Sequence, residues 1–226
     1  MGHDGSAEAS GDQRRVVVLG ATGATGRLLT SGAGERGHHV TAFARRPSAV
    51  VETADRVVGG SVTDVDRLEE AVSGSDAVLC ALGAATPLRR DATLVDGVAR
   101  LVAAMERHDV RRLVYLSFAG VRASRAQLSW LGRWVIAPVV LHNVVADHEA
   151  KEKIIIESDL DWTIVRPPRL SNGPARGYRS GEGIAATGIV PQVTRADVAA
   201  FMLETLTSDS YVHAAPAIVT RDDPGR

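Results

Sequence analysis

The sequence lacks the features of a disulfide-stabilised, nucleic-acid-binding or membrane protein. Its 226 residues include a single cysteine, Cys80, which excludes an internal disulfide and a metal cluster built on cysteines. The net charge is −1, so no basic field is present to recruit nucleic acid or anionic lipid. The longest apolar run near the middle, residues 134–141, is short and contains Pro138, so it cannot span a bilayer. We expect a soluble, cytoplasmic protein, monomeric or homodimeric, that acts on a small molecule.

Metal-binding patterns and a secretory signal are missing as well. The seven histidines show no H-x-x-x-H or H-E-x-x-H spacing, so we expect no metal site. Residues 1–13 are rich in Gly, Ser, Ala and acidic residues and contain no apolar core, which excludes a secretory signal. We expect them to form a disordered leader, or to be a remnant of cloning, before one domain at 14–220 and a tail at 221–226.

The most informative stretch is an apolar run that leads into three regularly spaced glycines. Residues 15–19, Arg-Val-Val-Val-Leu, are typical of a parallel strand that helices cover on both faces. Gly20 permits a tight turn, Gly23 lets a phosphate approach the backbone, and Gly26 lets the next helix pack on the strand. The spacing is G-x-x-G-x-x-G rather than the more common G-x-G-x-x-G, and such glycines also occur for purely structural reasons. Because the N-terminus of a helix suits an anion, we predict a dinucleotide site at Gly20, Thr22, Gly23, Ala24, Thr25 and Gly26.

Apolar segments and helical patterns alternate along the chain after these glycines. Alternating strands and helices imply right-handed crossovers and a parallel sheet. We predict an α/β fold, a Rossmann-type doubly wound parallel sheet in a single domain with a small substrate-capping region. The expected strands are residues 15–19, 39–44, 57–58, 76–82, 112–117 and 162–165, and the expected helices are 23–35, a helix capped by Thr63, 91–107, 144–157 and one opened by Thr194.

The second half of the chain is less regular. We expect residues 127–143 to be helical with a break at Pro138. Residues 169–190 are rich in Gly, Asn and Pro, so we expect mostly loop with a short hairpin. Thr194 and Asp197 form a capping-box-like pattern at the start of the last helix, and residues 217–219 are expected to add an edge strand.

Two arginines stand where such a sheet selects its nucleotide. In NAD-binding sheets, an acidic residue about 20 residues beyond the glycines accepts the ribose 2′-hydroxyl. Here the end of the second expected strand holds Arg45 and Arg46, with no acidic residue before Glu52. A guanidinium forms a two-pronged, charge-assisted contact with a 2′-phosphate, whereas a carboxylate would repel it. The pattern favours NADP(H) over NAD(H), and a solvated arginine pair at a strand end is the plain alternative.

An ordered set of motifs gives the chain a family resemblance from about Val16 to Leu206. The chain resembles the atypical short-chain dehydrogenase/reductases with an NmrA-like, NAD(P)H-binding fold, and within them the members related to biliverdin-IXβ reductase and flavin reductase. The motifs are Gly20-Ala-Thr-Gly-Ala-Thr-Gly26, Arg45, Gly60-Ser-Val62, Ala81-Leu-Gly83, Asp147-His148, and Asp-Trp-Thr-Ile-Val-Arg-Pro-Pro-Arg-Leu at 161–170.

The resemblance implies an NADPH-dependent reductase of flat, conjugated substrates such as flavins, quinones or tetrapyrroles. Relatives usually carry Asp at position 61 to accept the adenine amino group, and the serine found here accepts more weakly. By resemblance, the pyrophosphate is bound by residues 22–26, the 2′-phosphate by Arg45, the adenine by Ser61 and Val62, the body of the cofactor by Ala81, Leu82 and Gly83, and the nicotinamide by Pro167 and Pro168.

The Tyr-x-x-x-Lys motif of typical short-chain dehydrogenases is absent, since the residues four positions after the three tyrosines are Ala, Glu and Ala. By resemblance, the tyrosine position holds Val144, the lysine position holds His148, and Ser117 keeps one hydroxyl after the fifth strand. Because imidazole can donate a proton or bind the ribose near neutral pH, His148 and Ser117 are the candidate catalytic residues. The alternatives are a capping or solvated histidine, and a serine that only satisfies backbone groups.

Aromatic residues in the segment least like these relatives are candidates for a substrate pocket. Trp130 and Trp134 are one helical turn apart and share a face, and His142 follows them. Together they could cover a planar ligand, or they could form a core or oligomer contact. Arg169 could bind an acidic or carbonyl group of the substrate, or form a surface salt bridge.

These features favour an NADPH-dependent oxidoreductase that transfers hydride to a small conjugated or aromatic acceptor, such as a flavin, a quinone or a polyketide-like carbonyl compound. For such acceptors the cofactor performs the difficult step and water can supply the proton, so the missing Tyr-Lys pair is less of an obstacle. The alternatives are a non-catalytic NADP(H)-sensing protein and a Rossmann enzyme repurposed for isomerisation or cyclisation in natural-product tailoring.

Overall fold

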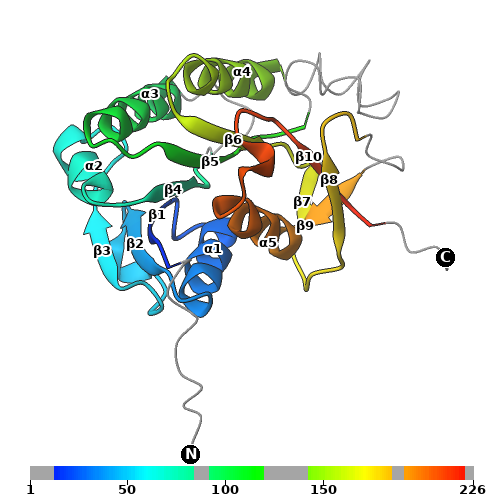
Figure 1. Ribbon diagram of the computed structural model, residues 1–226, viewed down its shortest axis with the longest axis horizontal. Coiled ribbons are helices and arrows are strands. Elements are labelled where there is room, and N and C mark those ends of the chain that lie inside the picture. The colour runs from blue at the N-terminus through cyan, green and yellow to red at the C-terminus, as the bar shows by residue number, and fades with distance from the viewer. Residues whose placement is uncertain (1–12, 84–91, 120–141, 185–190, 222–226) are drawn as a thin grey trace, which may run out of the picture.

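The computed structural model describes residues 13–83, 92–119, 142–184 and 191–221 (Figure 1). Six parallel strands form a sheet in the order β3-β2-β1-β4-β5-β6, which confirms the predicted doubly wound fold. The strand order reverses between β1 and β4, and ligands of such sheets bind beyond the C-terminal ends of the strands at that point. The strands are β1 (Arg15–Leu19), β2 (His39–Ala44), β3 (Arg56–Gly59), β4 (Ala77–Cys80), β5 (Arg112–Leu116) and β6 (Asp161–Val165).

Helices cover both faces of this sheet (Figure 1). Side chains alternate along β1, so Val17 and Leu19 enter one core while Val16 and Val18 enter the other, where they meet Leu29. Burial on both faces explains the continuous apolar run of β1 in the sequence. One layer contains α1 (Ala24–Glu35) and α5 (Arg195–Leu206), and the other contains α2 (Val65–Val72), α3 (Ala92–Arg107) and α4 (His142–Ile156).

Four short strands lie beside α5 at the right of Figure 1, where they form two small sheets. Within the described part of residues 169–190 the expected hairpin is wrong, because the strands at 169–171 and 178–181 pair with later segments instead of with each other. The expected edge strand at 217–219 is confirmed, although it pairs with β8 in a small sheet of its own. The parallel pair is β7 (Arg169–Ser171) with β9 (Gln192–Thr194), and the antiparallel pair is β8 (Tyr178–Gly181) with β10 (Ala217–Thr220).

Of the two helix N-caps predicted from the sequence, one is confirmed and the other is displaced by one residue. Thr194 caps α5 as predicted, since its hydroxyl accepts from the amide of Asp197 at 3.0 Å. The cap of α2 is Asp64 rather than Thr63, because the Asp64 carboxylate accepts from the amide of Arg67 at 3.3 Å. The Thr63 hydroxyl instead lies 3.0 Å from that of Ser61.

Candidate functional site

The loop between β1 and α1 requires glycine at two positions. Gly20 has a φ of +79°, and a Cβ there would lie 2.7 Å from the carbonyl oxygen of Ala81. A Cβ on Gly26 would lie 2.0 Å from the carbonyl oxygen of Gly20. Gly23 is the N-cap of α1 and offers no side-chain cap, and the first turn holds no acidic residue. The amides of this turn are therefore available to an anionic ligand.

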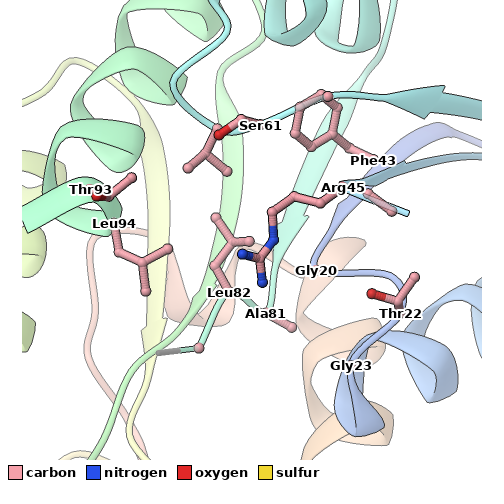
Figure 2. A pocket seen from close by; sticks show the side chains of 14 residues that line it. Gly20, Thr22, Gly23, Phe43, Arg45, Ser61, Ala81, Leu82, Thr93 and Leu94 are labelled. Atoms are coloured by element: carbon pink, nitrogen blue, oxygen red, sulfur yellow. The ribbon is translucent and has the colours of Figure 1, made fainter. Parts of the chain in front are cut away.

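A cavity of about 310 Å³ opens beside this loop, beyond the C-terminal ends of β1, β2 and β4 (Figure 2). Arg45 leaves the end of β2 and reaches into the cavity, between Ser61 on one side and Thr22 on the other (Figure 2). Its exposed guanidinium makes no hydrogen bond or ion pair with any residue that the structure describes. We call this cavity the Arg45 pocket; its lining is Gly20, Thr22, Gly23, Phe43, Ala44, Arg45, Gly60, Ser61, Val62, Ala81, Leu82, Gly83, Thr93 and Leu94.

Most of the cofactor residues expected from the sequence lie together in this lining, and the others lie nearby or apart. Ala24, Thr25 and Gly26 form the first turn of α1, where Ala24 is exposed and the other two are buried. Arg46 is exposed and does not line the Arg45 pocket. Pro167 and Pro168 are buried after β6, outside this lining.

Ser61 has a local partner that the sequence reading did not include. Its hydroxyl accepts from the amide of Thr63 at 3.4 Å and lies 3.0 Å from the Thr63 hydroxyl. The side chain thus closes the turn that follows β3 while still lining the pocket. The same oxygen would have to serve both the turn and an adenine amino group.

A second group of polar side chains lies at the ends of β5 and β6. Ser117 follows β5 and is buried, and its amide donates to the carbonyl oxygen of Val165 at 2.8 Å. Its hydroxyl is 3.3 Å from Nδ1 of His148 on α4 and donates to Oε1 of Glu152 at 2.5 Å. The structure therefore brings together the two candidate catalytic residues predicted from the sequence.

Glu152 and Arg166 complete this group, and the sequence reading missed both as site residues. Glu152 is fully buried, and Arg166 donates to its two oxygens at 3.1 Å and 2.6 Å. The available signal was the spacing, because Glu152 follows His148 by four residues and so shares its helix face. We call Ser117, His148, Glu152 and Arg166 the Ser117 cluster.

Burial controls the charge of the histidine in this cluster. It lowers the pKa of His148 to about 3, and the nearby positive charge of Lys151 acts in the same direction. The imidazole is therefore neutral at physiological pH. It can donate one hydrogen bond and accept one, but it does not act as an imidazolium acid.

Two other reactive groups lie behind the cluster in the core. Cys80 and Tyr115 are paired in register on β4 and β5, and both are fully buried. Burial raises the pKa of the Cys80 thiol to about 11, and burial also raises the pKa of Tyr115 well above its ordinary value. The Tyr115 hydroxyl has no hydrogen-bond partner within the described part of the chain. Neither group is suited to donate a proton at neutral pH.

Pro167 links the end of β6 to the cluster. Its carbonyl oxygen accepts from the amide of Ala119 at 2.7 Å, two residues after Ser117. The expected nicotinamide-binding prolines therefore follow β6 and lie beside the segment that carries Ser117 after β5.

The expected substrate residues are only partly described. Trp130 and Trp134 lie outside the described residues, and His142 is known only as the first residue of α4. Arg169 begins β7 with an exposed side chain and has no ion pair among the described residues. Among those residues no group of three or more His, Cys, Asp or Glu side chains could hold a metal ion, and no helix is long and apolar enough to cross a membrane.

Comparison with known proteins gives the family. A family model described as NAD(P)H-binding matches residues 20–209, which include the glycine loop, the Arg45 pocket and the Ser117 cluster. The chain belongs to this NAD(P)H-binding family. The match confirms the resemblance that the sequence motifs indicated.

Relatives and solved structures extend this result. The chain is 31% identical to a 3-diazoavenalumate denitrifying reductase from Streptomyces sp., over 93% of this chain and 74% of that protein. Its fold matches ChuY, an anaerobillin reductase from Escherichia coli O157:H7, with a TM-score of 0.76 and 19% identity over 94% of this chain and all of that one. It also matches a short-chain dehydrogenase/reductase from Veillonella parvula in complex with NADP, with a TM-score of 0.74 and 22% identity over 94% and 96% of the two chains. The chain is thus a member of an NAD(P)H-binding oxidoreductase family that includes reductases.

Proposed function

We propose that the protein is an NADPH-dependent reductase of small conjugated or aromatic acceptors, such as flavins, quinones or polyketide-like carbonyl compounds. The observation that carries this proposal is the Arg45 guanidinium, which reaches into the pocket beside the glycine loop without a partner among the described residues. A cation in that position favours a nucleotide with a 2′-phosphate over one with a free 2′-hydroxyl.

The residues of the pocket fit a dinucleotide. The uncapped first turn of α1 offers amides to a pyrophosphate, and glycines at 20 and 26 are required by contacts with backbone atoms. In our proposal residues 22–26 bind the pyrophosphate, through amides other than that of Gly23, which donates to the Gly20 carbonyl oxygen. Arg45, with Arg46 as a weaker contributor, binds the 2′-phosphate. The remaining cofactor contacts come from Ser61, Val62, Ala81, Leu82, Gly83, Pro167 and Pro168.

When bound, NADPH supplies the hydride. The protein's own part is to hold the acceptor beside Ser117 and His148. His148 is neutral and no Tyr-Lys pair is present, so the site lacks a strong acid for an alkoxide. This favours acceptors that take up hydride readily and gain their proton from water over simple ketones. Arg169, exposed at the start of β7, is the proposed contact for an acidic or carbonyl group of the substrate, together with Trp130, Trp134 and His142.

A second candidate is a protein that binds NADP(H) as a redox sensor without turnover. The observation in its favour is the same neutral His148, which is not protonated at pH 7 and so cannot act as an imidazolium acid. Isomerisation or cyclisation on the same scaffold is the third possibility and is separated by the same experiment.

The experiment follows NADPH absorbance at neutral pH with a panel of acceptors. The panel contains FMN, a quinone, a bilin, simple ketones and an aromatic diazo acid, because the Streptomyces relative is named for 3-diazoavenalumate. NADPH oxidation with a conjugated acceptor, faster than with any ketone, supports the proposal. Tight binding of NADPH without oxidation by any acceptor supports the sensor instead, and product without net NADPH loss supports isomerisation or cyclisation.

A further inference from the structure

Ser117 contacts two different groups with only one proton to donate. Its hydroxyl oxygen is 2.5 Å from Oε1 of Glu152 and 3.3 Å from Nδ1 of His148. The Glu152 side chain is a fully buried carboxylate, and both of its oxygens already accept hydrogen bonds from Arg166. Because a carboxylate accepts and the contact is much the shorter of the two, the Ser117 proton lies toward Glu152.

This assignment determines where the proton of His148 lies. With its own proton directed to Glu152, Ser117 can only accept in the contact with the imidazole. Nδ1 must then carry a hydrogen and donate it. Since the partly buried ring is neutral and so carries one N–H, Nε2 keeps a lone pair and accepts.

We infer that Glu152 is a positioning residue that takes the hydroxyl proton of Ser117 and thereby fixes His148 with its proton on Nδ1. Ser117 Oγ and His148 Nε2 then each keep a lone pair that can accept a hydrogen bond. This is the reverse of a site built on lysine or tyrosine, which presents N–H or O–H groups. A group that binds here must donate, as a ribose hydroxyl or a substrate N–H does.

The positions of these protons also limit which acceptors the site can bind. This conclusion rests on the proposed function as a reductase. An acceptor with an N–H or O–H beside the position that receives hydride can donate to these lone pairs, as a bilin does. An acceptor that offers only carbonyl oxygens places lone pair against lone pair, which costs desolvation without a hydrogen bond. The site therefore favours N–H-bearing acceptors over simple quinones and ketones.

Nuclear magnetic resonance of the ligand-free protein tests the proton assignment. In protein labelled with ¹⁵N-histidine, two-bond correlations from the ring carbon protons distinguish protonated from unprotonated ring nitrogens. The His148 signals are identified as those that disappear in His148→Gln. At pH 7 we expect a protonated Nδ1 and an unprotonated Nε2, and a wild-type ring protonated on Nε2 overturns the inference.

Two variants show whether the cluster causes this state. Ser117→Ala keeps the Glu152–Arg166 pair and removes the acceptor of Nδ1–H, so we expect the proton to move wholly or partly to Nε2. In Glu152→Gln a neutral amide replaces the carboxylate, and its NH2 group can donate to Ser117 Oγ and turn the hydroxyl proton toward Nδ1, with the same expected effect. Glu157→Gln, an exposed residue directly after the same helix, is the control and leaves the His148 signals unchanged. Retention of the wild-type tautomer in Ser117→Ala overturns the inference even if Glu152→Gln does not fold.

Kinetics test the substrate step separately. Glu152→Gln is expected to lower kcat for N–H-bearing acceptors by about 10- to 100-fold, while the KM for NADPH stays within about twofold because Glu152 does not line the Arg45 pocket. An equal fall for acceptors with and without N–H groups overturns the substrate step. If no acceptor oxidises NADPH, the proposed function fails, and the proton assignment is still decided by the resonance measurement.

Discussion

Gly26 lies so close to Gly20 that no side chain fits between them. A Cβ on Gly26 would be 2.0 Å from the Gly20 carbonyl oxygen and 2.7 Å from its carbonyl carbon. Both of these atoms belong to the backbone, so neither can move aside as a flexible side chain would. The contact holds the first turn of α1 against the end of β1, and with it the amides that face the proposed pyrophosphate.

Gly26→Ala is therefore expected to weaken NADPH binding at least tenfold, roughly the effect of a displacement of about 1 Å in a binding group. Fluorescence titration with NADPH measures the affinity. Gly34→Ala lies in the same helix, and its Cβ would be 3.3 Å from the nearest atom, the Thr53 carbonyl oxygen, so it serves as a matched control with near-normal affinity. Normal NADPH binding by Gly26→Ala would show that this loop does not hold the nucleotide.

The buried pair of Glu152 and Arg166 predicts a large loss of stability when one partner is removed. Arg166→Met leaves the fully buried Glu152 carboxylate without its cation, and we expect a loss of about 3–5 kcal/mol in the free energy of unfolding. The double variant Glu152→Met/Arg166→Met removes both charges and should recover a large part of that loss.

Urea denaturation with unchanged m-values measures these differences. Arg100→Met provides the control, because its ion pair with Asp96 is exposed and should contribute less than about 1 kcal/mol. The account of the Ser117 cluster is wrong if Arg166→Met costs no more than Arg100→Met.

The neutral state of His148 predicts how stability depends on pH. Its pKa is lowered to about 3 in the folded protein, first by burial and then by Lys151, whereas an unfolded histidine titrates near its ordinary value of about 6.5. Below pH 6.5 the unfolded state binds the proton and the folded state does not. The contribution of His148 to the free energy of unfolding is therefore complete above pH 6.5 and is lost as the pH falls toward the folded pKa. This group contributes a slope of at most about 1.4 kcal/mol per pH unit between pH 6.5 and 3.

Unfolding free energies measured between pH 7 and 4.5 test this slope against His148→Gln, which lacks the titrating ring. We expect a shallower dependence on pH in the variant. The exposed His39 offers a control. His39→Gln leaves the His148 ring in place, so the dependence of stability on pH should keep the wild-type slope. Parallel curves for wild type and His148→Gln would mean that the ring takes up its proton at the same pH in the folded and the unfolded protein, which contradicts the lowered pKa.

The glycine loop and the central sheet could be predicted from the sequence because their causes are local. Burial of β1 on both faces produces an apolar run, and the turn after it needs a residue with positive φ and close backbone contacts, which is glycine at 20. The cap of α5 could be predicted as well, because Thr194 and Asp197 lie within one helical turn of each other in the sequence.

Features that depend on long-range packing could not be predicted. The partners of β7 and β8 lie in β9 and β10, and short strands with mixed polarity carry no mark of which segment they pair with. In the sequence, Glu152 is an ordinary charged position of a helix and Arg166 is one residue before Pro167. Their ion pair forms only when α4 packs on β6. The charge pattern alone does not distinguish Arg45 from Arg46, and the structure turns only Arg45, the residue that the family resemblance pointed to, into the pocket.

Calorimetric titration with NADP⁺ and NAD⁺ tests the central claim most directly. The account predicts tighter binding of NADP⁺ than of NAD⁺ by the wild-type protein, and Arg45→Ala should lose about 10- to 100-fold in NADP⁺ affinity, the effect of about one charge-assisted hydrogen bond to a phosphate. Affinity for NAD⁺ should be unchanged, and Arg46→Ala should stay close to wild type for both. Indifference of the wild-type protein to saturating NADP⁺, or an equal loss of both nucleotides in Arg45→Ala, would contradict it.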